Sequence, residues 1–276
     1  MYGISVAGDG LPRVGKNGLR INDAMNVLSL ILGSVFLLLG GICRAESILA
    51  DDLILMSEEF PPYNFTDNNG DRKGTSIDLM VLILERMNSQ KTRKDIEMLP
   101  WTRAYQKIQK EKNTVLFAMV KTTEREKLFK WVGPISTANN ALIARKSQKI
   151  KIGSIEDAKK YTIGVVRDAA AAELVRKAGI PWENLNVVAK PEQNILKLER
   201  GRIDLIAYDE IVTRWILRDK GMKPEDFETV YLLEKGEHYF AFNKDTPDAL
   251  IQRMQAILDD LKKEGKYQEI LDKYLK

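Results

Sequence analysis

The stretch KTTEREKLFKWVGPI, residues 121–135, does most to decide the fold of this chain. It follows the apolar run TVLFAMV at 114–120, and a short continuous apolar run of this kind predicts a buried strand. Arg125 therefore opens a short helical turn at the end of a core strand. Ligands of open α/β sheets bind at such strand ends, so the segment predicts an α/β fold with Arg125 as a candidate ligand-binding residue.

A second segment repeats this plan with the opposite charge. In GRIDLIAYDE, residues 201–210, an apolar strand is predicted at 203–207, and Asp209 stands at the start of the next helix. A guanidinium offers a planar pair of donors that matches a carboxylate, and a carboxylate accepts hydrogen bonds from an ammonium group. One guanidinium and one carboxylate at two strand ends could together hold a zwitterion.

Strand and helix signals alternate from residue 52 onward, and the pattern restarts near residue 161. Such alternation predicts βαβ units and a mostly parallel sheet in each of two halves. Apolar stripes at helical spacing near the end of the chain predict two terminal helices. The expected strands are 53–56, 96–99, 114–120, 161–166, 185–189 and 203–207, and the expected helices include one capped by Ser76 and those at 101–110, 169–178, 191–200 and 211–220.

These two segments carry a resemblance to a known family. Residues 121–135 resemble the T-x-E-R … F-S-x-P signature of the bacterial extracellular solute-binding proteins of family 3, which are the periplasmic polar amino-acid-binding proteins of ABC importers. Residues 201–210 resemble the family's G-x-x-D-A-x-x-x-D segment. The resemblance covers most of residues 52–276. It implies a two-lobed periplasmic binding protein fold of type II, in which each lobe is a mostly parallel sheet flanked by helices and the ligand cleft lies between the lobes.

The same resemblance implies that the chain crosses twice between the lobes. Lobe one is then expected at 46–140 plus 240–276, and lobe two at 141–239. The strands that cross are expected at 139–145 and 237–243.

By resemblance, Arg125 holds the α-carboxylate of the ligand and Asp209 accepts its α-ammonium group. Each residue also has a simpler interpretation. Arg125 could pair with a neighbouring glutamate on a surface turn, and Asp209 could only cap a helix. Glu210 is the alternative to Asp209 if the register differs by one residue.

Aromatic residues after two other strand ends are further candidates. Phe60 and Tyr63 lie in EEFPPYNF, and Trp101 lies in LPWTRAY, with Arg103 at the same helix start. The resemblance implies that Phe60 stacks over the side chain of the ligand and that Trp101 covers it from the other side. Aromatic rings also attract a cationic ligand group.

The sequence departs from the family at two positions that normally contact a ligand. The strand before Arg125 ends in residues 118–120, Ala-Met-Val, where the family usually has Ser or Thr hydroxyls. The loop after Gly164 reads Val-Val-Arg-Asp at 165–168, and Arg167 is a candidate to replace the hydroxyls that the family offers there. The ligand could therefore also be peptide-like or another small carboxylate.

The first 45 residues have the three-part layout of a secretory signal peptide. Basic residues precede an apolar run at 27–39, and small residues at positions −3 and −1 favour cleavage after Ala45, with Met25 as an alternative start. We therefore expect a periplasmic protein. An uncleaved anchor is the alternative, although the run is shorter than the ~20 residues that a membrane span needs. A lipoprotein linked through Cys43 is disfavoured by the bulky Ile42.

Composition excludes several other classes of function. The chain has 276 residues, of which 44% are hydrophobic and 30% charged, and its net charge is only +4 without a basic stripe, so no nucleic-acid partner is expected. Cys43 is the single cysteine, which leaves the mature protein without a disulfide or a thiol nucleophile. The single histidine, His238, has no G-x-S-x-G motif to accompany it, and we expect no metal and no cofactor.

The leading hypothesis is a periplasmic solute-binding protein that captures a small zwitterion, with an amino acid as the first candidate. It would act as a monomer and deliver this ligand to an ABC permease in the inner membrane without doing chemistry. The alternatives are a dehydratase-like enzyme acting on a small cyclic acid, with Glu58, Glu59 or Asp209 as the general acid, and a stand-alone periplasmic sensor.

Overall fold

The computed structural model describes residues 1–3 and 50–275, and residues 46–276 belong to one compact unit. The predicted signal peptide, its cleavage site, Met25 and Cys43 lie outside the described residues. Within the part of the chain that is described, no helix is long and apolar enough to cross a membrane.

One eight-stranded sheet runs through the described part of the unit. Its two ends are parallel, because β1 pairs with β4 and β5, and β7 pairs with β8 and β9, in parallel register. The four central strands pair antiparallel. In spatial order the strands are β4 (Glu97–Met98), β1 (Ile54–Ser57), β5 (Thr114–Val120), β10 (Phe227–Asn243), β6 (Phe129–Arg145), β9 (Leu205–Asp209), β7 (Ile163–Val166) and β8 (Leu185–Val188).

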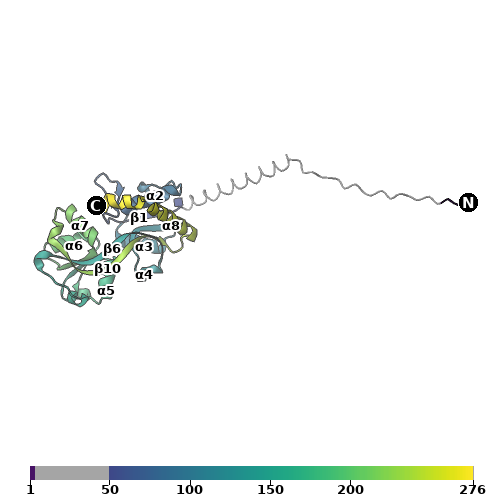
Figure 1. The fold of residues 1–276 in the computed structure, drawn as a ribbon. Helices are drawn as coiled ribbons and strands as arrows, with labels where there is room; N and C mark the ends of the chain where they lie inside the picture. The colour runs from purple at the N-terminus through teal and green to yellow at the C-terminus, as the bar shows by residue number, and fades with distance from the viewer. Residues whose placement is uncertain (4–49, 276) are drawn as a thin grey trace. The chain divides into compact units, whose positions relative to one another are not determined.

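The α helices fall into two groups, one at each end of the sheet (Figure 1). We call the part with β1, β4 and β5 lobe one and the part with β7, β8 and β9 lobe two. Lobe one also has a short hairpin of β2 (Phe65–Thr66) and β3 (Arg72–Lys73). The helices of lobe one are α2 (Thr75–Arg86), α3 (Trp101–Lys110), α4 (Thr123–Glu126), α8 (Asp248–Lys263) and α9 (Lys266–Leu275), and those of lobe two are α5 (Ala170–Lys177), α6 (Pro191–Glu199) and α7 (Glu210–Asp219).

The long strands β6 and β10 connect the lobes and pair with each other from one lobe into the other. The sequence predicted only the C-terminal parts of these strands, residues 139–145 and 237–243, as crossing strands. The two-lobed α/β fold is confirmed, and the other predicted strands and helices are present with bounds that differ by at most two residues. Ser76 was wrong as an N-cap: α2 begins at Thr75 after Gly74, and the Ser76 hydroxyl donates to the carbonyl of Tyr63. The residue at which one lobe ends and the other begins stays a prediction.

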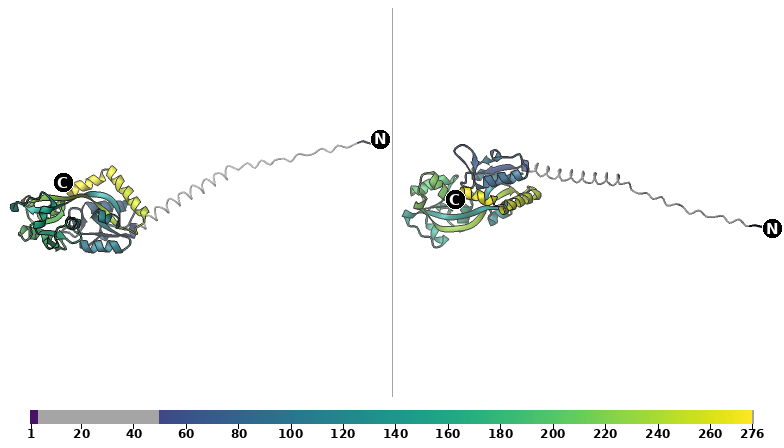
Figure 2. Two further views of the ribbon diagram at one scale, coloured as in Figure 1. Left: turned by 90° about the horizontal axis from the view of Figure 1, so that it is seen from below. Right: turned by 45° about the horizontal axis from the view of Figure 1, so that its top comes forward.

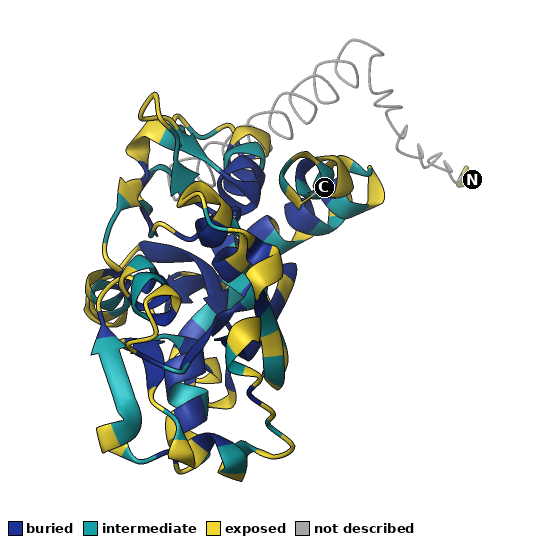
Figure 3. Cartoon of the chain, turned by 90° about the vertical axis from the view of Figure 1, so that its left-hand side faces the viewer, coloured by how far each residue is buried: buried dark blue, intermediate teal, exposed yellow. Residues whose placement is uncertain are grey.

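Each lobe has its own hydrophobic core, visible as dark blue strands and helix faces in Figure 3. All seven residues of β5 are buried, as its uninterrupted apolar sequence predicts. The core of lobe one forms where α2 packs on β5 and α8 packs on β6, and it includes Leu79, Phe117 and Met254. Burial of these apolar faces supplies most of the driving force that holds helices on a sheet.

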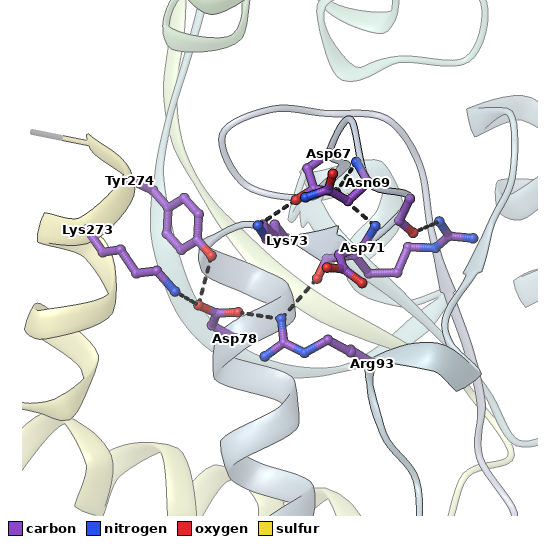
Figure 4. A network of polar contacts seen from close by, with 10 residues as sticks. Asp67, Asn69, Asp71, Lys73, Asp78, Arg93, Lys273 and Tyr274 are labelled. Atoms are coloured by element: carbon purple, nitrogen blue, oxygen red, sulfur yellow. Dashed lines mark hydrogen bonds and ion pairs between the residues drawn. The ribbon is translucent and has the colours of Figure 1, made fainter.

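The C-terminal helix α9 packs beside α2, far from it in sequence, as both views in Figure 2 show. Asp78 on α2 accepts hydrogen bonds from Lys273 Nζ at 2.7 Å and from the Tyr274 hydroxyl at 2.9 Å (Figure 4). Arg93 approaches the other carboxylate oxygen of Asp78 at 3.3 Å. The end of the chain is therefore fixed to lobe one by a charged network as well as by apolar contact.

Candidate functional site

A narrow cavity lies between the lobes and is lined from both of them. Four of the seven predicted ligand residues line it, namely Arg125, Asp209, Phe60 and Trp101. The other lining residues are Glu58, Ala118, Val120, Asn140, Val166, Ala169, Ala170, Ala171 and Tyr208.

Arg125 reaches the cavity from α4, at the end of β5. Thr122 caps this short helix by accepting a hydrogen bond from the backbone N–H of Arg125 at 3.3 Å. The Arg125 side chain is only 1% exposed, and its guanidinium lies 5.4 Å from the ring of Trp101 and 5.0 Å from that of Tyr105. The two rings enclose a buried cation next to the end of β5. Arg125 is therefore not part of an exposed ion pair on a surface turn.

Asp209 reaches the cavity from the end of β9 and is almost fully buried. One carboxylate oxygen accepts from the Val212 backbone N–H at 3.0 Å, and the other from Asn139 N–H at 3.2 Å. Asp209 is therefore the N-cap of α7 and a lining residue of the cavity at once. Burial raises the pKa of its carboxyl to about 6, although the backbone hydrogen bonds act in the opposite direction.

Glu210, the alternative to Asp209, faces a different part of lobe two. Its carboxylate accepts a hydrogen bond from the Thr229 hydroxyl at 3.1 Å and lies 3.7 Å from Arg214. Asp209 lines the cavity and Glu210 does not, so the alternative register does not apply.

The three predicted aromatic residues take different places. Phe60 and Trp101 line the cavity, and the indole N–H of Trp101 donates to the carbonyl of Asp168 in lobe two at 2.8 Å. Tyr63 is buried behind Phe60, with ring centroids 5.4 Å apart, and its hydroxyl donates to the carbonyl of Thr137. Tyr63 therefore supports Phe60 and does not line the cavity.

Arg103 and Arg167 are exposed, and neither lines the cavity, so the structure does not bring these two predicted residues into the site. Arg103 stands two positions after Trp101 on α3, and residues two apart on a helix do not face the same side. Arg167 follows β7, where its backbone N–H donates to Val188 while its side chain turns to solvent. The sequence identified the correct strand ends but not the direction of these side chains.

Glu58, which the sequence suggests only as a possible general acid, lines two cavities. Glu58 follows β1 directly and lines both the central cavity and a second one beside it, which is also lined by Glu59, Trp101, Lys190 and Glu192. Burial, followed by the nearby charge of Glu192, raises the pKa of Glu58 to about 8, while the charge of Arg125 lowers it in part. The position of Glu58 at a strand end is the one sequence signal that could have identified it as a residue that lines the cavity.

Among residues 1–3 and 50–275, no group of three or more His, Cys, Asp or Glu side chains is arranged to hold a metal ion.

Two α/β lobes joined by long strands, with a buried cation and a buried carboxylate lining one cavity between them, define a ligand-binding protein of the two-lobed type. The model of the bacterial extracellular solute-binding proteins, family 3, matches residues 53–276, and the chain belongs to this family. The family predicted from residues 121–135 and 201–210 is thereby confirmed.

Relatives with named ligands or roles are similar over most of their length. An arginine-binding periplasmic protein of Mannheimia haemolytica is 26% identical over 245 residues, which cover 87% of this chain and 96% of that protein. An ancestral arginine-binding protein bound to arginine has a TM-score of 0.69 at 24% identity, with 82% of this chain and 99% of that chain covered. A histidine kinase sensor domain with similarity to periplasmic binding proteins has a TM-score of 0.71 at 21% identity, covering 81% and 96%. The two solved structures are similar in fold.

Proposed function

We propose that this protein captures a small amino acid with a positively charged side chain between its lobes and delivers it to an ABC permease in the inner membrane. The observation that carries the proposal is that Arg125 from lobe one and Asp209 from lobe two line the same cavity. A zwitterion bridges two such groups only when the cleft is shut, so binding shifts the population toward the closed form.

The α-carboxylate of the ligand pairs with Arg125, and its α-ammonium group pairs with Asp209. Phe60 and Trp101 cover the ligand. The geometry of the guanidinium supports this assignment, because its planar donors match a carboxylate. Asn140 adds a donor, since its buried side-chain amide nitrogen has no hydrogen-bond partner among the described residues.

The charge of the second cavity supports a cationic side chain. Glu58, Glu59 and Glu192 line it together, against the single cation Lys190. One carboxylate oxygen of Glu192 is buried and has no partner in the described part of the chain. A guanidinium or ammonium group between Glu58 and Glu192 would satisfy these carboxylates. The arginine-binding relatives agree with this ligand class.

Delivery to a permease requires export, a free cleft and no covalent step. We therefore infer that the protein is a monomer, that residues 1–45 are a signal peptide cleaved after Ala45, and that it acts in the periplasm. Mass spectrometry of the protein purified from the periplasm tests the cleavage, because the expected N-terminal residue is Glu46.

One observation favours a second candidate, a dehydratase acting on a small cyclic acid. With its pKa at about 8, Glu58 holds a proton at neutral pH and could act as a general acid in the cavity. Turnover of a candidate acid would support this function, and ligand binding without any product supports transport.

The decisive experiment is calorimetric titration of the purified protein with L-arginine, L-lysine, L-histidine, L-glutamine and L-glutamate. We expect binding of basic amino acids, lost in Arg125→Ala and retained in Arg103→Ala, a matched control that removes an exposed arginine of lobe one. Tight binding of L-glutamate in preference to the basic amino acids would contradict the ligand class. Binding of L-arginine that survives Arg125→Ala would contradict the assignment of the carboxylate.

A further inference from the structure

Arg125 already has a carboxylate partner within the protein. Its Nη2 atom donates to Oε1 of Glu173 at 2.6 Å and to the backbone carbonyl of Asp168 at 2.9 Å. Both partners belong to lobe two, whereas Arg125 and the rings that enclose it belong to lobe one. The cation that is proposed to bind the ligand is therefore engaged across the cleft by the opposite lobe.

The contact between Arg125 and Glu173 is incomplete on both sides. Within the described residues, Arg125 Nε and the second carboxylate oxygen of Glu173 are buried and have no hydrogen-bond partner. The guanidinium thus uses one edge of its donor fork, although a carboxylate can accept two parallel hydrogen bonds from it. A ligand carboxylate that takes both donors can compete with a partner that takes only one.

The position of Glu173 allows its side chain to separate from Arg125. Glu173 stands in the first turn of α5 with 28% of its side chain exposed, whereas Arg125 is 1% exposed. A half-buried glutamate regains contact with solvent when it turns away from its partner. Arg125 has no such alternative, because its charge would stay buried without a partner. When the pair separates, Glu173 moves toward solvent and the guanidinium of Arg125 becomes available to another carboxylate.

We propose that Glu173 is a specificity-determining residue that competes with the carboxylate of the ligand for Arg125: it neutralises the guanidinium and links the lobes in the ligand-free protein, and a bound amino acid displaces it. The inference rests on the proposed function in that the ligand carries a carboxylate. Glu173 lowers the affinity for every ligand that must displace it, and it has no such effect on a ligand without a carboxylate.

A neighbouring ion pair supplies a matched control. Glu124 of α4 and Lys177 of α5 approach to 2.8 Å, one residue before Arg125 and one helical turn after Glu173. Both of these side chains are more than half exposed, and exposed ion pairs contribute little. Glu124→Gln therefore removes one charge between the same two helices without touching Arg125.

The test is calorimetric titration of wild type, Glu173→Gln and Glu124→Gln with L-arginine and with agmatine, which has the same guanidinium and amine but no carboxylate. We expect Glu173→Gln to bind L-arginine about tenfold tighter than wild type and to bind agmatine equally well. Glu124→Gln should match wild type with both ligands. Unchanged or weaker binding of L-arginine by Glu173→Gln, or an equal gain for agmatine, would overturn the proposal.

A second readout needs no ligand. Small-angle X-ray scattering of the ligand-free proteins should give a larger radius of gyration for Glu173→Gln than for wild type and Glu124→Gln, because the link between the lobes is lost. If wild type binds neither probe, the proposed function fails. The scattering then tests only whether Glu173 links the lobes, and equal radii of gyration for wild type and Glu173→Gln would overturn that part of the proposal.

Discussion

The hydroxyl of Ser136 lies 2.9 Å from Nδ1 of His238, and this contact joins β6 and β10 where both strands run between the lobes. His238 is completely buried, with the rings of Tyr63 and Phe60 centred 4.6 Å and 5.5 Å from its own. The single histidine of the chain is therefore part of the connection between the lobes, next to the aromatic wall of the cavity.

The burial of His238 predicts a loss of stability in acid. Burial lowers its pKa from 6.5 to about 3, so the unfolded chain takes up a proton in this interval while the folded protein does not. The contribution of neutral, buried His238 to the unfolding free energy is complete above pH 6.5 and is lost as the pH falls toward 3. Between pH 7.5 and 5.0 we expect the unfolding free energy of wild type to fall by about 2 kcal/mol relative to His238→Gln, measured by urea denaturation.

The comparison with His238→Gln isolates this effect. Asp209 and Glu58, whose folded-state pKa values are raised, favour the folded protein as the pH falls, and they do so equally in both proteins. Parallel loss of stability in wild type and variant would show that His238 is already protonated when folded.

Asp209 predicts the pH dependence of ligand affinity. Its pKa of about 6 in the ligand-free protein means that an ammonium group must displace a proton at lower pH. Below pH 6 we expect affinity to fall by up to about tenfold per pH unit relative to Asp209→Asn. At pH 7.5 that variant should bind about 10- to 100-fold more weakly, because a charged hydrogen bond is lost.

Asparagine is also a good N-cap, so Asp209→Asn leaves the start of α7 intact. Glu210→Gln, on the adjacent residue that does not line the cavity, is the control and should bind as wild type does. Titrations from pH 7 to 5 measure the effect. An equal pH dependence in wild type and Asp209→Asn would remove Asp209 from the binding site.

Glu58 predicts that binding of a basic amino acid releases a proton. At pH 7 its carboxyl is largely protonated, with a pKa of about 8, and a ligand cation beside it would favour the ionised form. We expect release of about one proton per L-arginine bound, seen as a binding enthalpy that differs between phosphate and Tris buffers.

Glu58→Gln should abolish this proton release, and it should weaken the binding of L-arginine more than the binding of L-glutamine. The control is Glu210→Gln, since Glu210 lines neither of the two cavities. If the enthalpy is the same in both buffers for wild type, the ligand cation does not meet Glu58.

The network around Asp78 predicts a purely structural effect. Its carboxylate receives hydrogen bonds from Lys273 and Tyr274, which join α9 to α2, and from Arg93 (Figure 4). Asp78→Ala should lower the unfolding free energy by about 2 kcal/mol and speed hydrogen exchange in α9. Glu269→Gln, which removes an exposed pair with Lys266 on α9, should change neither quantity. A loss of ligand affinity in Asp78→Ala would show that this network also reaches the cleft.

Local signals explain what could be predicted from the sequence. The apolar run of β5, the polar turn that seats Arg125 and the capping aspartate before α7 are properties of neighbouring residues, and each appears in the structure. Arg103 and Arg167 stand near the predicted strand ends, but their side chains are exposed and do not line the cavity. The position of a residue near a strand end does not decide which way a long side chain points.

The sequence by itself determined the order of strands and helices, the family, and the strand ends at which Arg125 and Asp209 stand, because hydrophobic period and turn chemistry act over a few residues. Only the tertiary structure decided which charges meet. Glu173 reaches Arg125 from 48 positions away, and Glu58 lines one cavity with Glu192 of the other lobe. Such encounters depend on how two independently packed lobes face each other across β6 and β10, and no local pattern encodes that orientation.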